Sequence, residues 1–310
     1  KIERIGGEEC LSEVRHPLIY KTIKECHEEY SYPIDISCQI LHVSKSAYYR
    51  WASGHKSDRQ QSNEQLAIVI EKIHEETPEK GYRAIRDVLC RDYDIPVNDK
   101  RVLRLCRILD IKSTVKHEPH GCTRQADNPQ YIAQNILNRN FHAEKPNQIW
   151  LTDVSEFKWV EDGTVHKVYL SAILDLYDRR IVAYVIGDRN NNELVYDTFR
   201  QAIKKYPDAH PIFHSDRGFQ YTNRTFRHML EEAGMIQSMS RKGKCQDNGP
   251  MEGFWGILKR ERYYGKVFTS KIELKTMIET YIEYYNTRRL QRKLGVVTPF
   301  EKYEMYRVAA

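Results

Sequence analysis

Apolar positions in the first part of the chain recur with the period of helices. Between residues 32 and 54, an apolar-periodic segment is followed by a turn at His42 and Val43, and Ser44 can cap a second short helix. Two short helices joined by such a turn have the outline of a helix-turn-helix, and a basic, aromatic second helix suits a DNA groove. Small helical domains use the same outline for packing alone, so this alternative stays open. The side chains of this helix expected to contact DNA are Lys45, Tyr49 and Arg50.

A second helical pattern covers residues 59–116. Residues 62–75 form an amphipathic helix, and residues 81–111 give a helix, a turn, and a further helix capped by Asn98. Basic residues recur along that last helix, and those expected to contact DNA are Arg101, Arg104 and Arg107. The pattern predicts a second helix-turn-helix. After it, prolines, polar residues and weak periodicity predict an extended linker over residues 117–140.

From Trp150 the pattern becomes that of strands. The predicted strands lie within residues 148–160, 163–187 (two strands), 210–221 and 236–240. The helices between them are predicted over 190–206 with an Asn cap and over 222–234, closed by Gly234. A last helix begins after Asn248, which can cap it, and continues to Arg262. This order predicts a mixed α/β layer fold.

Glu252 and Lys259 lie on that last helix. They are seven residues apart, which places them about two turns apart on one face. For an isolated acid and base, the ordinary interpretation is a surface charge pair on an amphipathic helix. The rest of the chain decides whether this interpretation holds.

Composition sets broad limits. The 310 residues, of which 40% are hydrophobic, are enough for two or three domains with a buried core. The longest apolar run, residues 168–174, is too short to span a membrane, and the N-terminus has no signal-peptide core, so a cytosolic protein is expected.

Seven cysteines without C-x-x-C spacing argue against a disulfide framework and a zinc ribbon. A metal site on His117, His120 and Cys122 lacks a regular second pair of ligands. Since the first methionine is Met229, we expect a removed or replaced initiator, or entry of the frame from an upstream segment.

The net charge of +6 is unevenly distributed. Basic residues concentrate within residues 100–124, 241–266 and 288–293, and the remainder of the chain is acidic. Such segments attract phosphates independently of sequence, which makes nucleic acid the expected partner, whereas any one segment alone is equally well explained as a solvated helix face. The further basic residues expected to contact DNA are Lys242, Lys244, Arg288 and Arg289.

Three acids lie at positions that suggest a functional site. Asp153 lies inside a predicted strand, Asp216 lies at the carboxyl end of another, and Glu252 starts a helix. Three carboxylates that converge from distant segments suit a pair of hard divalent cations, which take oxygen ligands and leave positions open for phosphate. Such a site aligns an attacking hydroxyl and a leaving oxygen on a phosphodiester. The other acids of this region are expected to be exposed to solvent: Glu156, Asp162, Asp175 and Asp178.

Four segments carry a resemblance to a known family: "WLTDVSEF", "HSDRGFQY", "DNGPMEGFWGILKRE" and "YIEYYNTRRLQRKLGVVTPFEKY". They resemble the OrfB part of the transposases of a large frameshifting family of bacterial insertion sequences, within the retroviral-integrase superfamily. "SKSAYYRW" and "GYRAI" are similar to its N-terminal helical modules, so the resemblance covers nearly the whole chain. Gly253 departs from it, because many members carry serine or another small polar residue there, but this position is no expected metal ligand.

The resemblance implies an α/β RNase H-like core, a mixed five-stranded sheet flanked by helices, preceded by all-α helix-turn-helix modules. It implies an Asp-Asp-Glu triad of Asp153, Asp216 and Glu252 that binds Mg²⁺ or Mn²⁺, with two ions per active site, and it places Lys259 where it contacts DNA near the element end. Members of the family cut one strand at an element's end and join it to the other end. They later insert the excised circle by attack of a 3′-hydroxyl.

Double-stranded DNA is the partner that the resemblance implies, both as terminal inverted repeats and as target. A homo-oligomer of at least two copies is expected on this DNA, in the bacterial cytoplasm and at the nucleoid when active. The expected domains are the helix-turn-helix modules at 1–58 and 59–116, the linker at 117–140, the catalytic core at 141–290 and a C-terminal tail at 291–310.

Two rival functions remain at this point. One is an RNase H-like nuclease that cleaves DNA without joining it, and the other is a DNA-binding regulator built on an inactive core. The intact triad argues against the regulator. Only an assay of joining separates the transposase from the nuclease.

Overall fold

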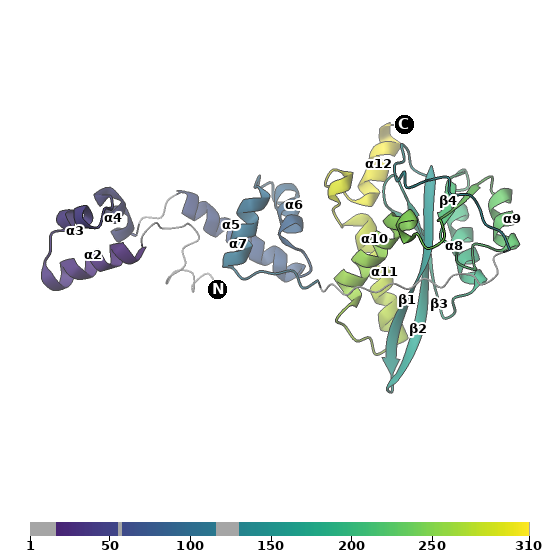
Figure 1. The fold of residues 1–310 in the computed structure, drawn as a ribbon, viewed down its shortest axis with the longest axis horizontal. Coiled ribbons are helices and arrows are strands. Elements are labelled where there is room, and N and C mark those ends of the chain that lie inside the picture. Colours follow the sequence, from purple (N-terminus) through teal and green to yellow (C-terminus); the bar gives the residue numbers. More distant parts are fainter. Residues whose placement is uncertain (1–16, 55–57, 116–129, 310) are drawn as a thin grey trace. The chain divides into compact units, whose positions relative to one another are not determined.

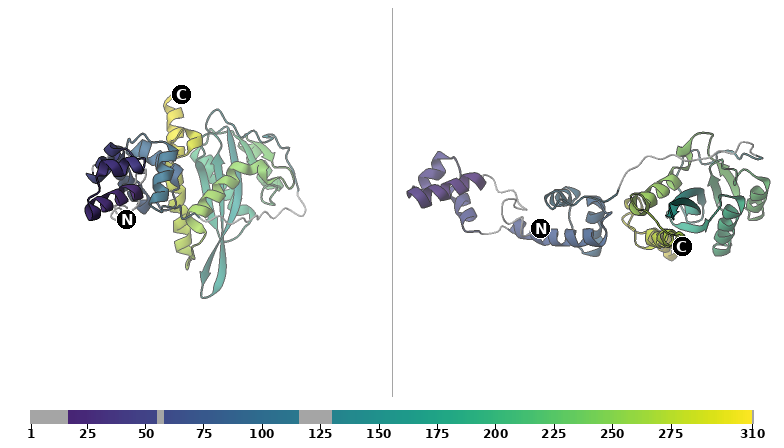
Figure 2. Two further views of the ribbon diagram at one scale, coloured as in Figure 1. Left: turned by 60° about the vertical axis from the view of Figure 1, so that its left-hand side comes forward. Right: turned by 90° about the horizontal axis from the view of Figure 1, so that it is seen from below.

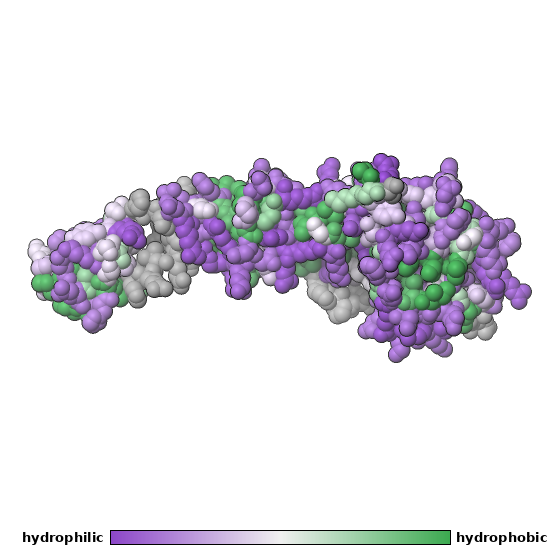
Figure 3. Space-filling view, turned by 90° about the horizontal axis from the view of Figure 1, so that it is seen from above, coloured by the Kyte–Doolittle hydropathy of each residue, from purple (hydrophilic) through white to green (hydrophobic). Residues whose placement is uncertain are grey.

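The computed structural model describes residues 17–54, 58–115 and 130–309, and the chain divides into two compact units, Lys1–Thr114 and Val115–Ala310. The metal site considered on His117, His120 and Cys122 lies outside the described residues. Within the described ranges, no helix is long and apolar enough to cross a membrane. Hydrophilic residues cover most of the face that Figure 3 shows, and hydrophobic residues gather there only in limited patches.

The first unit is helical throughout its described part. Its helices are α2 (Pro17–Tyr30), α3 (Ile34–Ile40), α4 (Lys45–Ala52), α5 (Asp58–Glu76), α6 (Tyr82–Asp92) and α7 (Asp99–Ile108) (Figure 1). Helices α2 to α4 enclose a small core that includes Tyr20 and Tyr48, and helices α5 to α7 enclose a larger one that includes Ile70 and Leu105. Both predicted helix pairs are therefore present, and α2 is a helix that the sequence pattern did not indicate.

Helix caps test the local predictions. Asn98 caps α7 as predicted, because its side-chain oxygen accepts a hydrogen bond from the Arg101 N–H at 2.8 Å. Ser44 stands at the predicted N-cap position of α4, but its hydroxyl makes no cap bond and lies 2.8 Å from the hydroxyl of Ser46 instead. The predicted start of α4 is therefore correct, but the predicted capping hydrogen bond of Ser44 is wrong.

The second unit is built on a mixed five-stranded sheet. Its strands are β1 (Ile149–Glu161), β2 (Thr164–Asp175), β3 (Ile181–Gly187), β4 (Ile212–Ser215) and β5 (Ile236–Met239). Their order across the sheet is β3-β2-β1-β4-β5, where β1 and β3 run antiparallel to β2, and β4 runs parallel to both β1 and β5. The mixed five-stranded sheet that the family resemblance implied is therefore present.

Helices cover both faces of this sheet (Figures 1 and 2). They are α8 (Asn192–Lys205), α9 (Arg224–Glu232), α10 (Gly249–Leu258), α11 (Lys271–Thr287) and α12 (Pro299–Ala309). Successive residues of a strand point to opposite faces, so Trp150 packs with Phe199 in the layer of α8 and α9, whereas Leu151 packs with Phe254 in the layer of α10 and α11. The sheet is therefore the middle of three layers.

Two segments differ from the predicted domain outline. Residues 130–140, predicted within the linker, lack regular secondary structure but run along the sheet, where Leu137 is buried and the Ile136 N–H donates to the Ser238 hydroxyl at 3.0 Å. The predicted tail, residues 291–310, contains α12. Sequence periodicity could not indicate the first segment, because isolated buried residues in an irregular stretch leave no repeating pattern.

Helix α12 is attached to the rest of the second unit at its start and along its length. Thr298 and Glu301 form a reciprocal capping box, in which each backbone N–H donates to the other side chain, at 2.8 and 3.2 Å. The ring of Tyr303 lies with its centroid 3.5 Å from the guanidinium carbon of Arg180. The last helix is therefore part of the folded core rather than a tail.

Candidate active site

Asp153 and Asp216 lie level on adjacent strands. Strands β1 and β4 pair in parallel with Leu151 opposite His214, so Asp153 and Asp216, each two positions further along, reach the same place on the sheet. Neighbouring strands lie about 4.8 Å apart, which makes these two acids neighbours. Asp216 directly follows the last residue of β4, at the predicted carboxyl end of a strand.

Helix α10 is tied to β1 on both sides of Glu252. The Asn248 amide donates to the Thr152 carbonyl at 3.1 Å, and the Trp255 indole N–H donates to Asp153 Oδ2 at 3.0 Å. Glu252 lies between these two attachments in sequence, four residues after Asn248 and three before Trp255, which places it on the same side of the helix. Asn248 was predicted to cap α10 and does not, because its side chain bonds to β1 instead.

The electrostatics of the acids reflect their closeness. Burial, then the negative charge of Asp216, and to a smaller extent that of Glu252, raise the pKa of Asp153 to about 8, although N–H groups of Val154 and Trp255 oppose the rise. Burial also raises the pKa of Asp216. Among the described residues, no Lys, Arg or His forms an ion pair with Asp153 or Asp216. Two adjacent carboxylates without a protein cation favour the binding of an external cation.

The chemistry of these acids fits a hard divalent cation. Asp153 and Asp216 are half-buried and supply carboxylate oxygens, the ligands that Mg²⁺ and Mn²⁺ prefer, and Glu252 is exposed on the helix beside them. Within the described ranges, no group of three or more His, Cys, Asp and Glu side chains is arranged around a common metal position. The structure therefore brings the two aspartates together and leaves Glu252 on the adjoining helix face.

The strand and loop around Asp216 are tightly packed. The Gly218 N–H donates to Asp216 Oδ1 at 2.8 Å, and a β-carbon at Gly218 would meet that same oxygen at 3.0 Å and Gln220 Oε1 at 2.8 Å. Only glycine fits this approach without a shift of its neighbours. Burial lowers the pKa of His214 to about 4, so this histidine is neutral at pH 7, and its Nδ1 lies 2.9 Å from the Ser238 hydroxyl.

Lys259 begins a single π-helical turn, η2 (Lys259–Tyr263), directly after α10. The Tyr264 N–H donates to the Lys259 carbonyl at 2.7 Å, so the predicted helix to Arg262 is α-helical only to Leu258. The ammonium of Lys259 lies 5.0 Å from the ring centroid of the buried Phe157. Such π turns are frequent at functional sites, and this one sets the side chain of Lys259 at the end of the helix that carries Glu252.

Several basic residues predicted to contact DNA also make contacts within the protein. Arg101 donates to the side chains of Asn63 and Ser62 at 2.9 and 2.8 Å, and Lys45 lies 2.5 Å from Asp35. Arg104 is half-buried, and Arg289 donates through two nitrogens to Glu261, with a shortest distance of 2.7 Å. The predicted DNA contacts that are exposed in the structure are Lys45, Tyr49, Arg50, Arg107, Lys242, Lys244 and Arg288.

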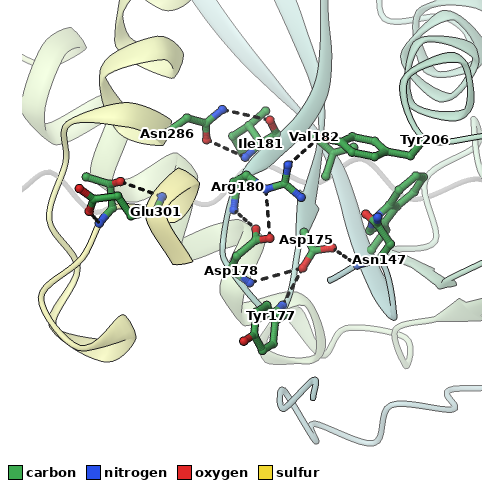
Figure 4. A network of polar contacts seen from close by, with 12 residues as sticks. Asn147, Asp175, Tyr177, Asp178, Arg180, Ile181, Val182, Tyr206, Asn286 and Glu301 are labelled. Carbon is green, nitrogen blue, oxygen red and sulfur yellow. Dashed lines mark hydrogen bonds and ion pairs between the residues drawn. The ribbon is translucent and has the colours of Figure 1, made fainter. Parts of the chain in front are cut away.

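Asp175 and Asp178 were predicted to be exposed, and this was wrong. Both are fully buried, and Arg180 donates from Nε to Asp178 at 3.0 Å (Figure 4). Backbone N–H groups of Asn147 and Tyr177 donate to Asp175 at 2.6 and 2.8 Å. Burial, then the charge of Asp175, raise the pKa of Asp178 to about 7, and the charge of Arg180 opposes this rise. The burial of these two aspartates could not be predicted from the residues around them, because it depends on the burial of Arg180 beside them.

Comparison with known proteins places both units. Residues 143–245 and 233–299 match two families described as "Integrase core domain", and residues 61–119 match one described as "HTH-like domain". The catalytic core domain of HTLV-2 integrase, solved in complex with magnesium, aligns with 52% of this chain and 99% of its own at 17% identity and a TM-score of 0.41.

Two bacterial relatives are similar over most of their length. The insertion element IS600 31 kDa protein of Shigella sonnei is 37% identical over 272 residues, which cover 87% of this chain and 98% of that protein. The transposase for insertion sequence element IS904 of Lactococcus lactis is 33% identical over 261 residues, which cover 82% and 99%. With both integrase-core matches on the sheet and helices that carry the three acids, the chain belongs to the OrfB-type transposases of bacterial insertion sequences, which are DDE-type polynucleotidyl transferases.

Proposed function

We propose that this transposase cleaves DNA at the terminal inverted repeats of an insertion sequence and joins the new 3′ end to a second DNA, with Asp153, Asp216 and Glu252 as the catalytic acids. The observation that supports this most is the pair of Asp153 and Asp216. These carboxylates are level on adjacent strands, have no protein cation among the described residues, and lie beside the helix that carries Glu252.

The three acids are the residues that would hold Mg²⁺ or Mn²⁺, with two ions per active site. Bound ions of this kind supply the positive charge that aligns the attacking and leaving oxygens of a phosphodiester. The chain's own part is to orient the ligands: Trp255 fixes Asp153 through its indole N–H, and Gly218 fixes Asp216 through its backbone N–H. Ligands that are oriented in advance do not have to reorganise when the cation and the DNA bind.

We assign the recognition of the terminal repeats to the helical unit and the contacts near the cleaved bond to the catalytic unit. Exposed Tyr49 and Arg50 on α4, and Arg107 on α7, are suitable to reach a DNA groove. Lys259, at the end of α10, is suited to a phosphate close to the acids. At least two copies of the chain on the DNA would bring two element ends together.

The test is an incubation of the full-length protein with labelled duplexes of the candidate element end and Mg²⁺, with a scrambled duplex and an Asp216→Asn variant as controls. We expect nicked and joined products from the cognate end alone, and none from the variant. Nicked products without joined ones would identify a nuclease instead. The absence of both products, with a cognate end that the protein binds, would contradict the proposal.

A further inference from the structure

Asp247 is a fully buried acid five residues before Glu252, in the short helix η1 (Cys245–Asn248) that leads into α10. Its carboxylate accepts five hydrogen bonds. Arg139 donates from Nε at 2.7 Å, Arg241 donates from Nε and a terminal nitrogen at 2.8 Å each and from its backbone N–H at 3.0 Å, and the Asn135 amide donates at 3.0 Å. No donor of this cluster belongs to α10 itself.

The donors come from segments that are far apart in sequence. Asn135 and Arg139 belong to the irregular segment that precedes β1, and Arg241 follows β5. Hydrogen bonds from Arg241, and then from Arg139, hold the pKa of Asp247 well below its usual range, so the acid stays charged at any pH near neutrality. Asp247 is therefore a fixed charge that joins the start of the core, the end of its last strand and the approach to α10.

The helix that follows has only some of the usual local start signals, namely Pro250 and Glu252 in its first turn. Helix α10 has the sequence GPMEGFWGIL, in which three glycines lower the helix propensity, and no side chain caps its N-terminus. Asn248 uses its amide to reach Thr152 of β1, one residue before Asp153. The start of α10 is thus set by two neighbouring side chains, Asp247 on one side and Asn248 on the other.

We propose that Asp247 is a positioning residue for the active site: it holds η1 against residues 135–139 and Arg241, and thereby fixes where α10 presents Glu252 to Asp153. Asp247 does not contact the reacting atoms, and its effect passes through the backbone of η1. This inference rests on the proposed function, since it gives Glu252 a place in the metal site.

The test compares full-length Asp247→Asn with a matched control, Asp178→Asn. Both changes replace a fully buried, Arg-paired aspartate by an amide of the same shape. Asp178 lies beyond Asp175, whose strand partner is Trp150 near the start of β1, and so is not part of the approach to α10. Three quantities are measured below the unfolding temperature of each variant: single-turnover cleavage of the end duplex, the DNA concentration at half-saturation, and Mn²⁺ binding to the DNA-free protein by calorimetry.

Asp247→Asn should lose about a hundredfold in single-turnover rate, because an error of about 1 Å near the reacting atoms has an effect of this size. Its Mn²⁺ affinity should fall about tenfold, the loss expected when a residue that orients metal ligands is changed. The DNA concentration at half-saturation should stay unchanged. Asp178→Asn should keep the wild-type rate and Mn²⁺ affinity, whatever its thermal midpoint.

A pair of arginine variants covers the case in which Asp247→Asn fails to fold. Arg241→Lys keeps a positive charge beside Asp247. It should therefore lose less of the single-turnover rate and of the Mn²⁺ affinity than Arg241→Met. A folded Asp247→Asn with wild-type rate and affinity would overturn the inference, as would equal losses in Asp247→Asn and Asp178→Asn. If the wild type itself fails to cleave, the proposed function is wrong, and Mn²⁺ binding still decides whether Asp247 positions the site.

Discussion

Two pairs of aspartates lie on the same sheet, and they differ in what neutralises them. Asp175 and Asp178 are fully buried, and Arg180 supplies a positive charge 3.0 Å from Asp178. Asp153 and Asp216 are half-buried, and among the described residues no Lys, Arg or His pairs with them. The first pair has its counter-charge within the fold and so serves stability. The second pair has none in the described part of the chain, so we infer that its counter-charge is a bound cation.

The neutralised pair also connects distant parts of the catalytic unit. Arg180 donates to the Tyr206 hydroxyl at 2.5 Å, and its guanidinium lies against the ring of Tyr303 in α12. Removing one partner from a buried ion pair is strongly destabilising, because the other charge stays behind without compensation. Changes at this pair should therefore affect stability, whereas changes at Asp153 and Asp216 should affect catalysis.

The largest expected effect concerns the three acids proposed to be catalytic. Asp153→Asn, Asp216→Asn and Glu252→Gln should each lower cleavage and joining by at least about a thousandfold, because each removes a negative charge that the cation needs and keeps the side-chain shape. Binding of the element end, measured by gel shift in the absence of divalent ions, should remain near the wild-type level. A variant with near wild-type strand transfer would remove its residue from the triad.

The next effect concerns the counter-charge of the buried pair. Arg180→Met should lower the free energy of unfolding at neutral pH by about 3 kcal/mol, because it leaves Asp175 and Asp178 buried without a cation. Chemical denaturation measures this loss. Single-turnover cleavage by the folded variant should match the wild type. A variant that is as stable as the wild type, or one that is folded but inactive, would break the comparison between the two pairs.

The next prediction compares two basic residues, Arg289 and Lys259. Arg289 pairs with Glu261, and Lys259 follows the last residue of α10, the helix that carries Glu252. Lys259→Ala should lose about a hundredfold in single-turnover rate, since it would remove the proposed phosphate contact and so misplace the DNA. Its thermal midpoint should change much less than its rate, because Lys259 is half-buried and a cation over an aromatic ring contributes about 0.5–2 kcal/mol.

The matched variants for this position are Lys259→Arg and Lys266→Ala. Lys259→Arg keeps the positive charge and should retain part of the activity, although a planar guanidinium binds phosphate with a different geometry from an ammonium. Lys266 is exposed and basic, and its replacement should leave the rate unchanged. If Lys259→Ala cleaves as fast as the wild type, Lys259 is a packing or surface residue only.

The smallest effect is a pH dependence of stability. The pKa of Asp178 is raised to about 7, so between about pH 4 and 7 the folded protein keeps a proton that the unfolded chain releases, and stability falls as the pH rises. Arg180 lowers the pKa of Asp178, so this pKa should be higher in Arg180→Met. The loss of stability with rising pH should therefore continue to a higher pH in that variant. The difference in thermal midpoint between wild type and Arg180→Met should therefore widen from about pH 5 to about pH 8 without divalent ions. A constant or narrowing difference would contradict this account of the pair.

Local signals explain which predictions succeeded. Asn98 and Asn191 cap their helices because each side chain reaches an N–H only three residues away, a contact between residues that are close in sequence. Asn248 has the same residue type before a helix, yet its amide bonds to Thr152, 96 residues earlier. A tertiary partner of this kind cannot be read from the residues around Asn248.

The candidate site divides in the same way. Asp153 inside a strand and Asp216 at a strand end were recognisable, because charge at such positions is rare and strand ends meet at one edge of a sheet. Trp255 donates to Asp153 and Arg139 donates to Asp247, and each of these contacts joins residues about a hundred positions apart in sequence. The burial of Asp175 was missed for the same reason, since its N–H donor Asn147 lies on another segment.

We infer, as the central point, that Asp153 and Asp216 bind a divalent cation because no described residue supplies them with a counter-charge. Calorimetric titration of Mn²⁺ into the DNA-free, full-length protein tests it directly, with Asp216→Asn and Asp178→Asn alongside the wild type. The account predicts binding by the wild type and by Asp178→Asn with equal affinity, and binding at least about tenfold weaker by Asp216→Asn. Equal affinity in the wild type and Asp216→Asn, or no binding by the wild type, would contradict it.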